Sequence, residues 1–207
     1  MAKWQPHLVS RLEVISNGID LEKFKASDRL EKEPVTILSV GRLVKKKNFD
    51  TAIKAIKALG SISVRYIIIG EGEERENLME WVRDNRLDDK IEILGHKENV
   101  SEYLSDADIF LLPSRWEGFG LSLVEAMATG LPSIVSDVPG ISEVLGEDGV
   151  CGFKIPPEDE GEMAMQLKAL IENPALREKM GADAVLRSKA FCIRKTAKAY
   201  CELYKGL

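Results

Sequence analysis

The chain has 207 residues, of which 44% are hydrophobic and 30% are charged, and its formal net charge is −5 at pH 7. This composition excludes a disordered chain, and the acidic balance argues against a nucleic-acid-binding protein, which would carry a basic excess. No apolar run approaches the roughly 20 residues of a membrane helix, and the first residues do not look like a secretory signal. Three cysteines without C-x-x-C spacing suggest free thiols in a reducing compartment, so we expect a cytoplasmic protein.

From about residue 34 onward, short apolar runs alternate with amphipathic stretches. The apolar runs predict strands over 35–41, 64–69, 91–94, 109–112, 133–136 and 152–155. The amphipathic stretches predict helices over 48–60, 73–85, 100–105, 121–129, 141–145 and 160–172, with two more helical stretches between Pro174 and Tyr204. Strands that are apolar on both faces need helices on both faces. The pattern therefore predicts an α/β fold, a doubly wound Rossmann-like parallel sheet of about six strands, with its ligand beyond the carboxyl ends of the strands.

The alternation also suggests how the chain is divided. Residues 1–33 do not join it and are expected to form a connector and a linker. Residues 34–190 hold the Rossmann-like domain, and residues 191–207 form a C-terminal helix. A stripe of Leu and Tyr along that last helix is expected to serve packing.

A cluster of cations follows the first predicted strand, where Arg42 comes directly after the strand and Lys45, Lys46 and Lys47 come just before a helix. At the expected ligand edge, these cations could neutralise a phosphate or a diphosphate. The alternative is a solvated charge run, which is the more common situation and which we expect for Lys45 and Lys46. Cations at a helix N-terminus oppose the helix dipole, which favours an anionic partner for Arg42 and Lys47.

A second cluster follows the predicted strand 109–112, in a loop that contains Glu117, Gly118 and Gly120. The two glycines allow a ligand to approach the backbone, and the helix that begins near Leu121 points free N–H groups toward it. Glu125 lies about one turn into this helix, on its apolar face, where an isolated carboxylate would be costly. Its partner could be the vicinal hydroxyls of a ribose, or equally a neighbouring Arg or Lys in a salt bridge.

Several motifs resemble known sites without matching them. The stretch Gly70–Arg75 lacks the third glycine of a dinucleotide fingerprint, and its glutamates would repel a pyrophosphate. Asp106 and Asp108 precede a strand, away from the expected ligand edge, so we assign them a structural role. His7 and His96 are isolated, which disfavours a zinc site, and we expect no metal.

Together these stretches resemble the C-terminal, donor-binding domain of a retaining glycosyltransferase of family 4, with the GT-B fold. The specific signal is E-G-F-G-L-x-x-x-E, combined with G-R-L and a lysine five residues after its arginine. The resemblance covers almost the whole chain, from about residue 14 to 204. The matching stretches are Ile15–Asp20, Ser39–Asp50, Tyr66–Gly72, Ile91–His96, Ala107–Ser114, Glu117–Ala128 and Val138–Glu143.

The resemblance implies a role for each site residue. Arg42 and Lys47 would hold the diphosphate and stabilise it as it leaves, Glu117 would lie near the transferred sugar, and Glu125 would bind the ribose hydroxyls. These enzymes need no divalent metal or other cofactor, and their donor is a nucleoside diphosphate sugar, here linked to UDP or GDP. Backbone around Phe119–Leu121 would contact the diphosphate and the sugar, and Gly95 and His96 would lie near the base. The full implied donor-binding set is Gly41, Gly95, His96, Gly118, Phe119, Gly120, Leu121 and Glu125.

A GT-B enzyme has two Rossmann-like domains, yet only sixteen residues precede N-G-I-D in this chain. We therefore expect a separate N-terminal domain to bind an acceptor glycan or lipid-linked glycan and to make any contact with the cytosolic face of the membrane. The C-terminal helix would return toward that domain, and this fragment would be inactive alone. Two alternatives are a binding-only or partner subunit that supplies the nucleotide-sugar site, and a GT-B sugar-nucleotide epimerase relative. The E-G-F-G-L-x-x-x-E arrangement favours the transferase.

Overall fold

A computed structural model of the chain describes residues 13–26 and 32–205. His7 and residues 27–31 of the expected linker lie outside the described residues. Within these ranges, six parallel strands form one sheet in the order β3-β2-β1-β4-β5-β6. The strands are β1 (Val35–Val40), β2 (Val64–Ile69), β3 (Ile91–Leu94), β4 (Ile109–Leu112), β5 (Ser133–Ser136) and β6 (Gly152–Ile155). The predicted doubly wound α/β fold is confirmed.

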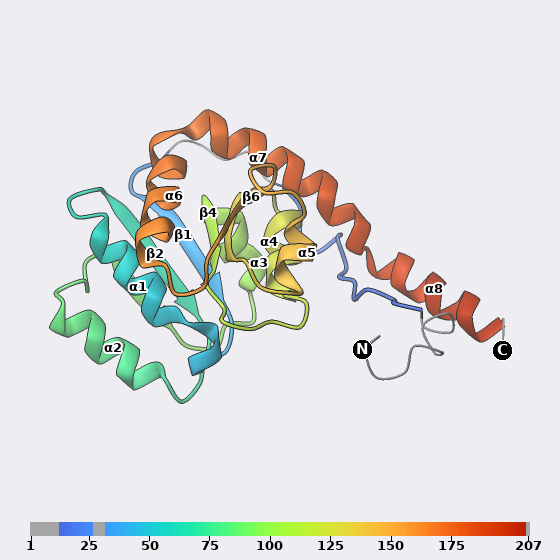
Figure 1. Cartoon of the computed structure of the whole chain (residues 1–207), viewed down its shortest axis with the longest axis horizontal. Helices are drawn as coiled ribbons and strands as arrows, with labels where there is room; N and C mark the ends of the chain where they lie inside the picture. Colours follow the sequence, from blue (N-terminus) through green and yellow to red (C-terminus); the bar gives the residue numbers. More distant parts are fainter. Residues whose placement is uncertain (1–12, 27–31, 206–207) are drawn as a thin grey trace.

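Helices cover both faces of the sheet, as strands buried on both sides require (Figure 1). One face carries α1 (Phe49–Ala58), α2 (Arg75–Asp84) and α6 (Glu160–Glu172). The other carries α3 (Val100–Asp106), α4 (Leu121–Ala128) and α5 (Ile141–Leu145). The remaining helices are η2 (Lys45–Lys47), α7 (Pro174–Ser188), η3 (Lys189–Phe191) and α8 (Ile193–Lys205).

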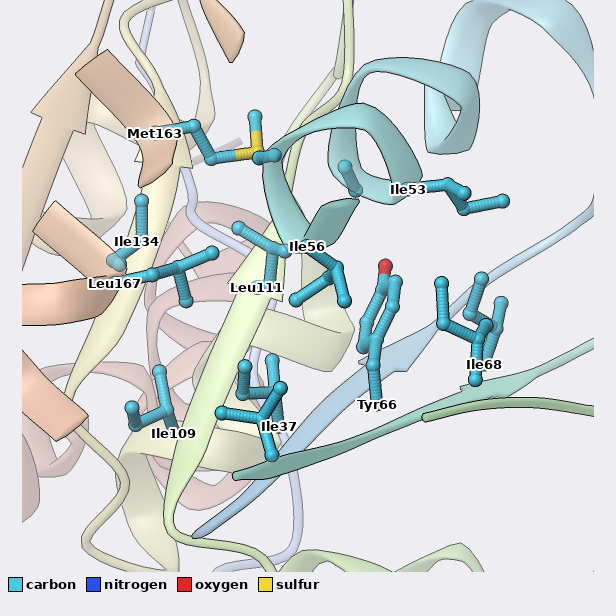
Figure 2. Packing of buried hydrophobic residues seen from close by; sticks show 14 of the residues in the cluster. Ile37, Ile53, Ile56, Tyr66, Ile68, Ile109, Leu111, Ile134, Met163 and Leu167 are labelled. Atoms are coloured by element: carbon cyan, nitrogen blue, oxygen red, sulfur yellow. The ribbon is translucent and has the colours of Figure 1, made fainter. Parts of the chain in front are cut away.

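The core beneath α1 and α6 is almost entirely aliphatic (Figure 2). On this face, side chains from the central strands contact Ile53 and Ile56 of α1, and further along the sheet they contact Met163 and Leu167 of α6. Tyr66 is the one polar side chain labelled in this close-up, and its hydroxyl lies 2.8 Å from the Ser39 hydroxyl. Burial raises the pKa of Tyr66, so the hydroxyl stays neutral in this layer.

Two helices are shorter than the sequence predicts. Helix α2 begins at Arg75 rather than near residue 73, because the residues before it form a turn in which the Arg75 N–H donates to the Gly72 carbonyl at 3.1 Å; the Glu74 N–H donates to the Leu43 carbonyl at 2.9 Å. Helix α1 ends at Ala58, before Gly60, which adopts a left-handed conformation (φ 61°). The other helices agree with the predicted ranges to within a residue where those ranges were given.

Asp108 has the structural role that the sequence predicts. Its side chain is buried and accepts a hydrogen bond from the Thr36 N–H at 2.8 Å, while its own N–H donates to the Thr36 carbonyl at 2.8 Å. Asp108 therefore joins the start of β4 to β1, at the amino end of the sheet.

The C-terminal helix α8 extends away from the sheet, beside the N-terminal segment (Figure 1). A parallel bridge between Ile19 and Cys192 anchors its start. None of its residues is buried, and Tyr204 is 71% exposed. The expectation that its Leu and Tyr stripe serves packing is not met by the described part of this chain. Every helix among the described residues falls short of the length and apolarity of a membrane span.

Candidate functional site

The order of the strands reverses between β1 and β4, because the chain passes from β1 outward to β3 and then returns to β4 on the other side of β1. In open α/β sheets, such a switch point leaves a crevice at the carboxyl ends of the two strands. The turn after β1 and the loop after β4 therefore lie next to each other. We call Lys45–Lys47 the lysine turn and Arg115–Gly120 the glutamate loop.

Lys47 and Glu117 meet at this switch point although they lie 70 residues apart in the sequence. The Lys47 ammonium donates a hydrogen bond to Glu117 Oε2, and the two side chains are 11% and 16% exposed. The aliphatic part of Lys47 lies over Gly41, where an added Cβ would be 3.3 Å from Lys47 Cε. A bulkier residue at Gly41 would therefore crowd the lysine.

Arg42 is exposed at the carboxyl end of β1, and no ion pair among the described residues involves it. The backbone of Gly70 and Gly72 packs closely against the turn that carries Arg42. A Cβ at Gly70 would lie 1.9 Å from the Gly41 carbonyl oxygen, and one at Gly72 would lie 2.2 Å from the Leu43 carbonyl oxygen. The G-E-G stretch therefore supports the turn of Arg42 by close backbone packing, a role that its resemblance to a nucleotide fingerprint did not indicate.

Helix α4 begins beside the ion pair. Its N-cap is Gly120, in a left-handed conformation (φ 85°), which has no side chain to accept from the N–H groups of the first turn. Gly118 faces open space, since an added Cβ would have no atom within 4 Å. Phe119 is half-buried and packs edge-to-face against Phe191, with ring centroids 5.5 Å apart. The N-terminus of α4 is thus accessible to a ligand, and Leu121 at its start is exposed.

Glu125 is half-buried in the second turn of α4, between buried Val124 and Ala126. No hydrogen bond or ion pair of its carboxylate occurs among the described residues, and desolvation raises its pKa. The salt bridge considered from the sequence is therefore not formed with any residue that the structure describes. A carboxylate without a partner can accept from neighbouring hydroxyl donors of a ligand.

Gly95 and His96 follow β3, the edge strand. An added Cβ at Gly95 would lie 2.4 Å from Glu71 Oε1, so the Glu71 carboxylate packs closely over this glycine. His96 is exposed. These residues are two strands away from Arg42, on the side of β1 opposite to Glu117.

The structure adds Trp116, Arg115 and Gly140 to the residues singled out from the sequence. Trp116 lies under Lys46, whose ammonium is 4.9 Å from the ring centroid. The Arg115 guanidinium donates hydrogen bonds to the Lys45 carbonyl in the lysine turn and to the Asp50 carboxylate in α1. Gly140, before α5, lies beneath the glutamate loop, where a Cβ would be 2.6 Å from the Glu117 carbonyl oxygen. Trp116 and Arg115 lie one and two residues before Glu117 in the sequence, but nothing local in the sequence predicts their partners.

The described residues contain no group of three or more His, Cys, Asp or Glu side chains that could hold a metal ion. The charged groups that could meet an anion in this crevice are the side chains of Arg42 and Lys47. Together with the N-terminus of α4, they can bind a phosphate-containing ligand by fixed hydrogen-bond donors.

Curated relatives of this chain include two bacterial transferases. The amylovoran biosynthesis glycosyltransferase AmsK of Erwinia amylovora is 37% identical over 190 residues, which cover 83% of this chain and 46% of the relative. The N-acetylgalactosamine-N,N'-diacetylbacillosaminyl-diphospho-undecaprenol 4-alpha-N-acetylgalactosaminyltransferase of Campylobacter jejuni is 31% identical, over 91% of this chain and 52% of the relative. The chain therefore spans about half the length of these relatives.

Solved structures with the same fold include sucrose-phosphate synthase from Thermosynechococcus elongatus, with a TM-score of 0.86 and 24% identity over 99% of this chain and 55% of that one. HepE of Anabaena, solved in complex with UDP, has a TM-score of 0.85 and 23% identity over 94% of this chain and 57% of that one. The fold is thus that of a Rossmann-like half of GT-B glycosyltransferases. Residues 20–187 match the family model of glycosyl transferases group 1, and the chain belongs to this family.

Proposed function

We propose that this chain is the donor-binding part of a glycosyltransferase of family 4, which takes a nucleoside diphosphate sugar and transfers the sugar with retention of configuration. The observation that carries the proposal is the Lys47–Glu117 pair at the switch point, beside the open N-terminus of α4 and exposed Arg42. This arrangement places cations and N–H donors around a space that suits a diphosphate.

The electrostatics of the site suit the departure of a diphosphate. Negative charge grows on the diphosphate as the bond to the sugar breaks, and Arg42 and Lys47 would stabilise it without moving far. Backbone around Phe119–Leu121 would contact the same group, over the close-packed backbone of Gly41 and the open position of Gly118. Glu117, which pairs with Lys47, would lie near the sugar.

The order of the strands supports one direction for the donor. The carboxylate of Glu125, which has no partner in the described part of the chain, would accept hydrogen bonds from the ribose hydroxyls. The base, uracil or guanine, would lie toward the edge strand β3, near Gly95 and His96, and the sugar would lie toward Glu117 on the other side of β1.

The rest of the enzyme would supply the acceptor. Because the chain spans about half the length of its curated relatives, we infer that a second, N-terminal domain binds an acceptor glycan or a lipid-linked glycan at the cytosolic face of the membrane. Residues 1–33 would connect the two domains, and the helix within 191–207 would return to the N-terminal one. The donor part alone would bind its nucleotide without turnover.

Calorimetric titration of this chain with UDP and with GDP tests the proposed site. We expect one of the two nucleotides to bind with a stoichiometry of one, and we expect Arg42→Ala to weaken it at least about tenfold by removing charge-assisted hydrogen bonds. Arg86→Ala, which removes an exposed arginine away from the crevice, serves as the control and should leave the affinity unchanged. Absence of binding by either nucleotide, or equal affinity of Arg42→Ala and wild type, would contradict the proposed donor site.

A further inference from the structure

The lysine turn and the glutamate loop contact each other residue by residue. The Arg115 guanidinium donates to the Lys45 carbonyl, and the Arg115 backbone N–H donates to the Lys46 carbonyl at 2.8 Å. The Lys46 ammonium lies over the Trp116 ring, and Lys47 pairs with Glu117. Three consecutive residues of one segment thus meet three consecutive residues of the other, in the same order.

Arg115 also joins this pair of segments to the rest of the fold. Its Nη2 lies 3.3 Å from Asp50 Oδ2 in the first turn of α1, and its Nε donates to Glu158 in the connection between β6 and α6. The arginine side chain is 34% exposed. One guanidinium therefore contacts the lysine turn, α1 and the β6–α6 connection, each through a different nitrogen.

The planar geometry of arginine explains why one residue can do this. Its five N–H donors point in fixed directions, and bonds to ionised or carbonyl acceptors restrain the position of the side chain. A single exposed ion pair contributes little, but a network with several acceptors restrains its members more strongly. Lysine could not replace these contacts, because its ammonium is a point charge on a flexible stem.

The restraint matters because Lys47 and Glu117 both lie outside regular strands and long helices. A functional pair must be held to within about 0.5 Å of its working geometry by residues behind it. Lys45 and Lys46, which precede Lys47, and Arg115, which lies two residues before Glu117, provide the contacts that fix both backbones.

We propose that Arg115 is a positioning residue, which holds Lys47 against Glu117 by tying the lysine turn to the glutamate loop, α1 and the β6–α6 connection. The importance of this position for the donor rests on the proposed function of Lys47. Arg115 acts through the two loops and needs no contact with the ligand.

Lysine labelling followed by mass spectrometry tests this on the whole chain. In wild type, Lys47 should react slowly because its ammonium is buried in the pair, whereas exposed Lys45 should react fast. We expect Arg115→Met, which keeps the length of the side chain, to raise the labelling rate of Lys47 about tenfold, the scale of one lost charge-assisted hydrogen bond. Lys90, which donates to the Ile62 carbonyl at 3.0 Å elsewhere in the fold, should keep its rate as an internal control.

Arg65→Met is the matched control variant. Arg65 forms a bidentate pair with Glu92 at 2.8 and 2.9 Å between β2 and β3, away from the lysine turn, so its loss should leave Lys47 protected. If Arg115→Met does not fold, the double variant Asp50→Asn with Glu158→Gln removes the two carboxylates and keeps the arginine, and the same rise is expected. Unchanged labelling of Lys47 in the folded variant would overturn the proposal.

Titration with UDP and GDP separates this inference from the proposed function. If wild type binds one nucleotide, Arg115→Met should weaken it about tenfold while Arg65→Met does not. An unchanged affinity combined with faster labelling of Lys47 would support the positioning role of Arg115 and would contradict the proposed role of Lys47 in donor binding. If wild type binds neither nucleotide, the proposed function fails, whereas the labelling rates still decide whether Arg115 holds Lys47.

Discussion

Glu125 is a carboxylate in the proposed donor site whose surroundings in the folded protein differ from water. Its carboxylate is half-buried on α4 without a partner among the described residues, and desolvation raises its pKa above the ordinary value of 4.5. A carboxyl group with a raised pKa in the folded state destabilises the fold when it is ionised. The binding function proposed for Glu125 therefore has a cost in stability, which a ligand would offset.

We expect Glu125→Gln to raise the free energy of unfolding at pH 7 by up to about 1 kcal/mol, the lower end of the cost of burying an unpaired polar group. The folded state binds the Glu125 proton more tightly than the unfolded state, so the contribution of this carboxyl group to stability falls as pH rises from about 4.5 through its raised folded pKa. The difference in free energy of unfolding between the glutamine variant and wild type should accordingly increase as pH rises over this range. Denaturant unfolding at pH 4 and pH 7 measures it, with exposed Glu76→Gln as the control. A glutamine variant that is less stable at pH 7 would show that the carboxylate has a partner in the fold.

At the scale of elements, the glutamate loop depends on the glycine that precedes α5. Gly140 adopts φ 90° and ψ −65°, and a Cβ there would lie 2.6 and 2.8 Å from the carbonyl oxygens of Glu117 and Gly118. An L residue at this position is strained and also pushes against backbone. The loop that carries Glu117 would have to move to make room.

Gly140→Ala should therefore lower the free energy of unfolding by about 1–3 kcal/mol and weaken nucleotide binding as well. Gly149→Ala provides a matched control, because Gly149 also has a positive φ (78°) but an added Cβ meets no atom within 4 Å. The control should lose stability through backbone strain and keep its affinity. Denaturant unfolding and calorimetric titration measure the two effects, and equal affinities of the two variants would contradict the link between Gly140 and the loop.

The elements themselves were largely predictable, and their contacts were not. Each strand is a short apolar run because both of its faces are buried, and each covering helix shows the period of its buried side, so the pattern identifies both. Helix α2 differs at its start because the residues before it form a turn, and the Glu74 N–H there donates to the Leu43 carbonyl in a separate turn. The Lys46–Trp116 contact and the Arg115 network likewise depend on β1 and β4 lying side by side, which no local pattern encodes.

For the whole molecule, the placement of the site follows from the topology. Arg42 and Lys47 follow β1, and Glu117 follows β4, so the reversal of strand order brings together residues that the sequence separates by 70 positions. A resemblance to a family could indicate these residues, but their pairing required the fold. Helix α8 was predicted as a helix, yet its apolar stripe has no covering within the described chain (Figure 1).

Hydrogen exchange in the presence of saturating UDP or GDP tests the central claim most directly, because it locates the nucleotide on the backbone. Peptides that cover 41–48 and 117–125 should exchange more slowly with the bound nucleotide, since the turn after β1 and the N-terminus of α4 would both contact it. Peptides over 171–177, at the opposite end of the sheet, should be unchanged. Binding measured by calorimetry without slower exchange in 41–48 and 117–125 would contradict a donor site at the switch point.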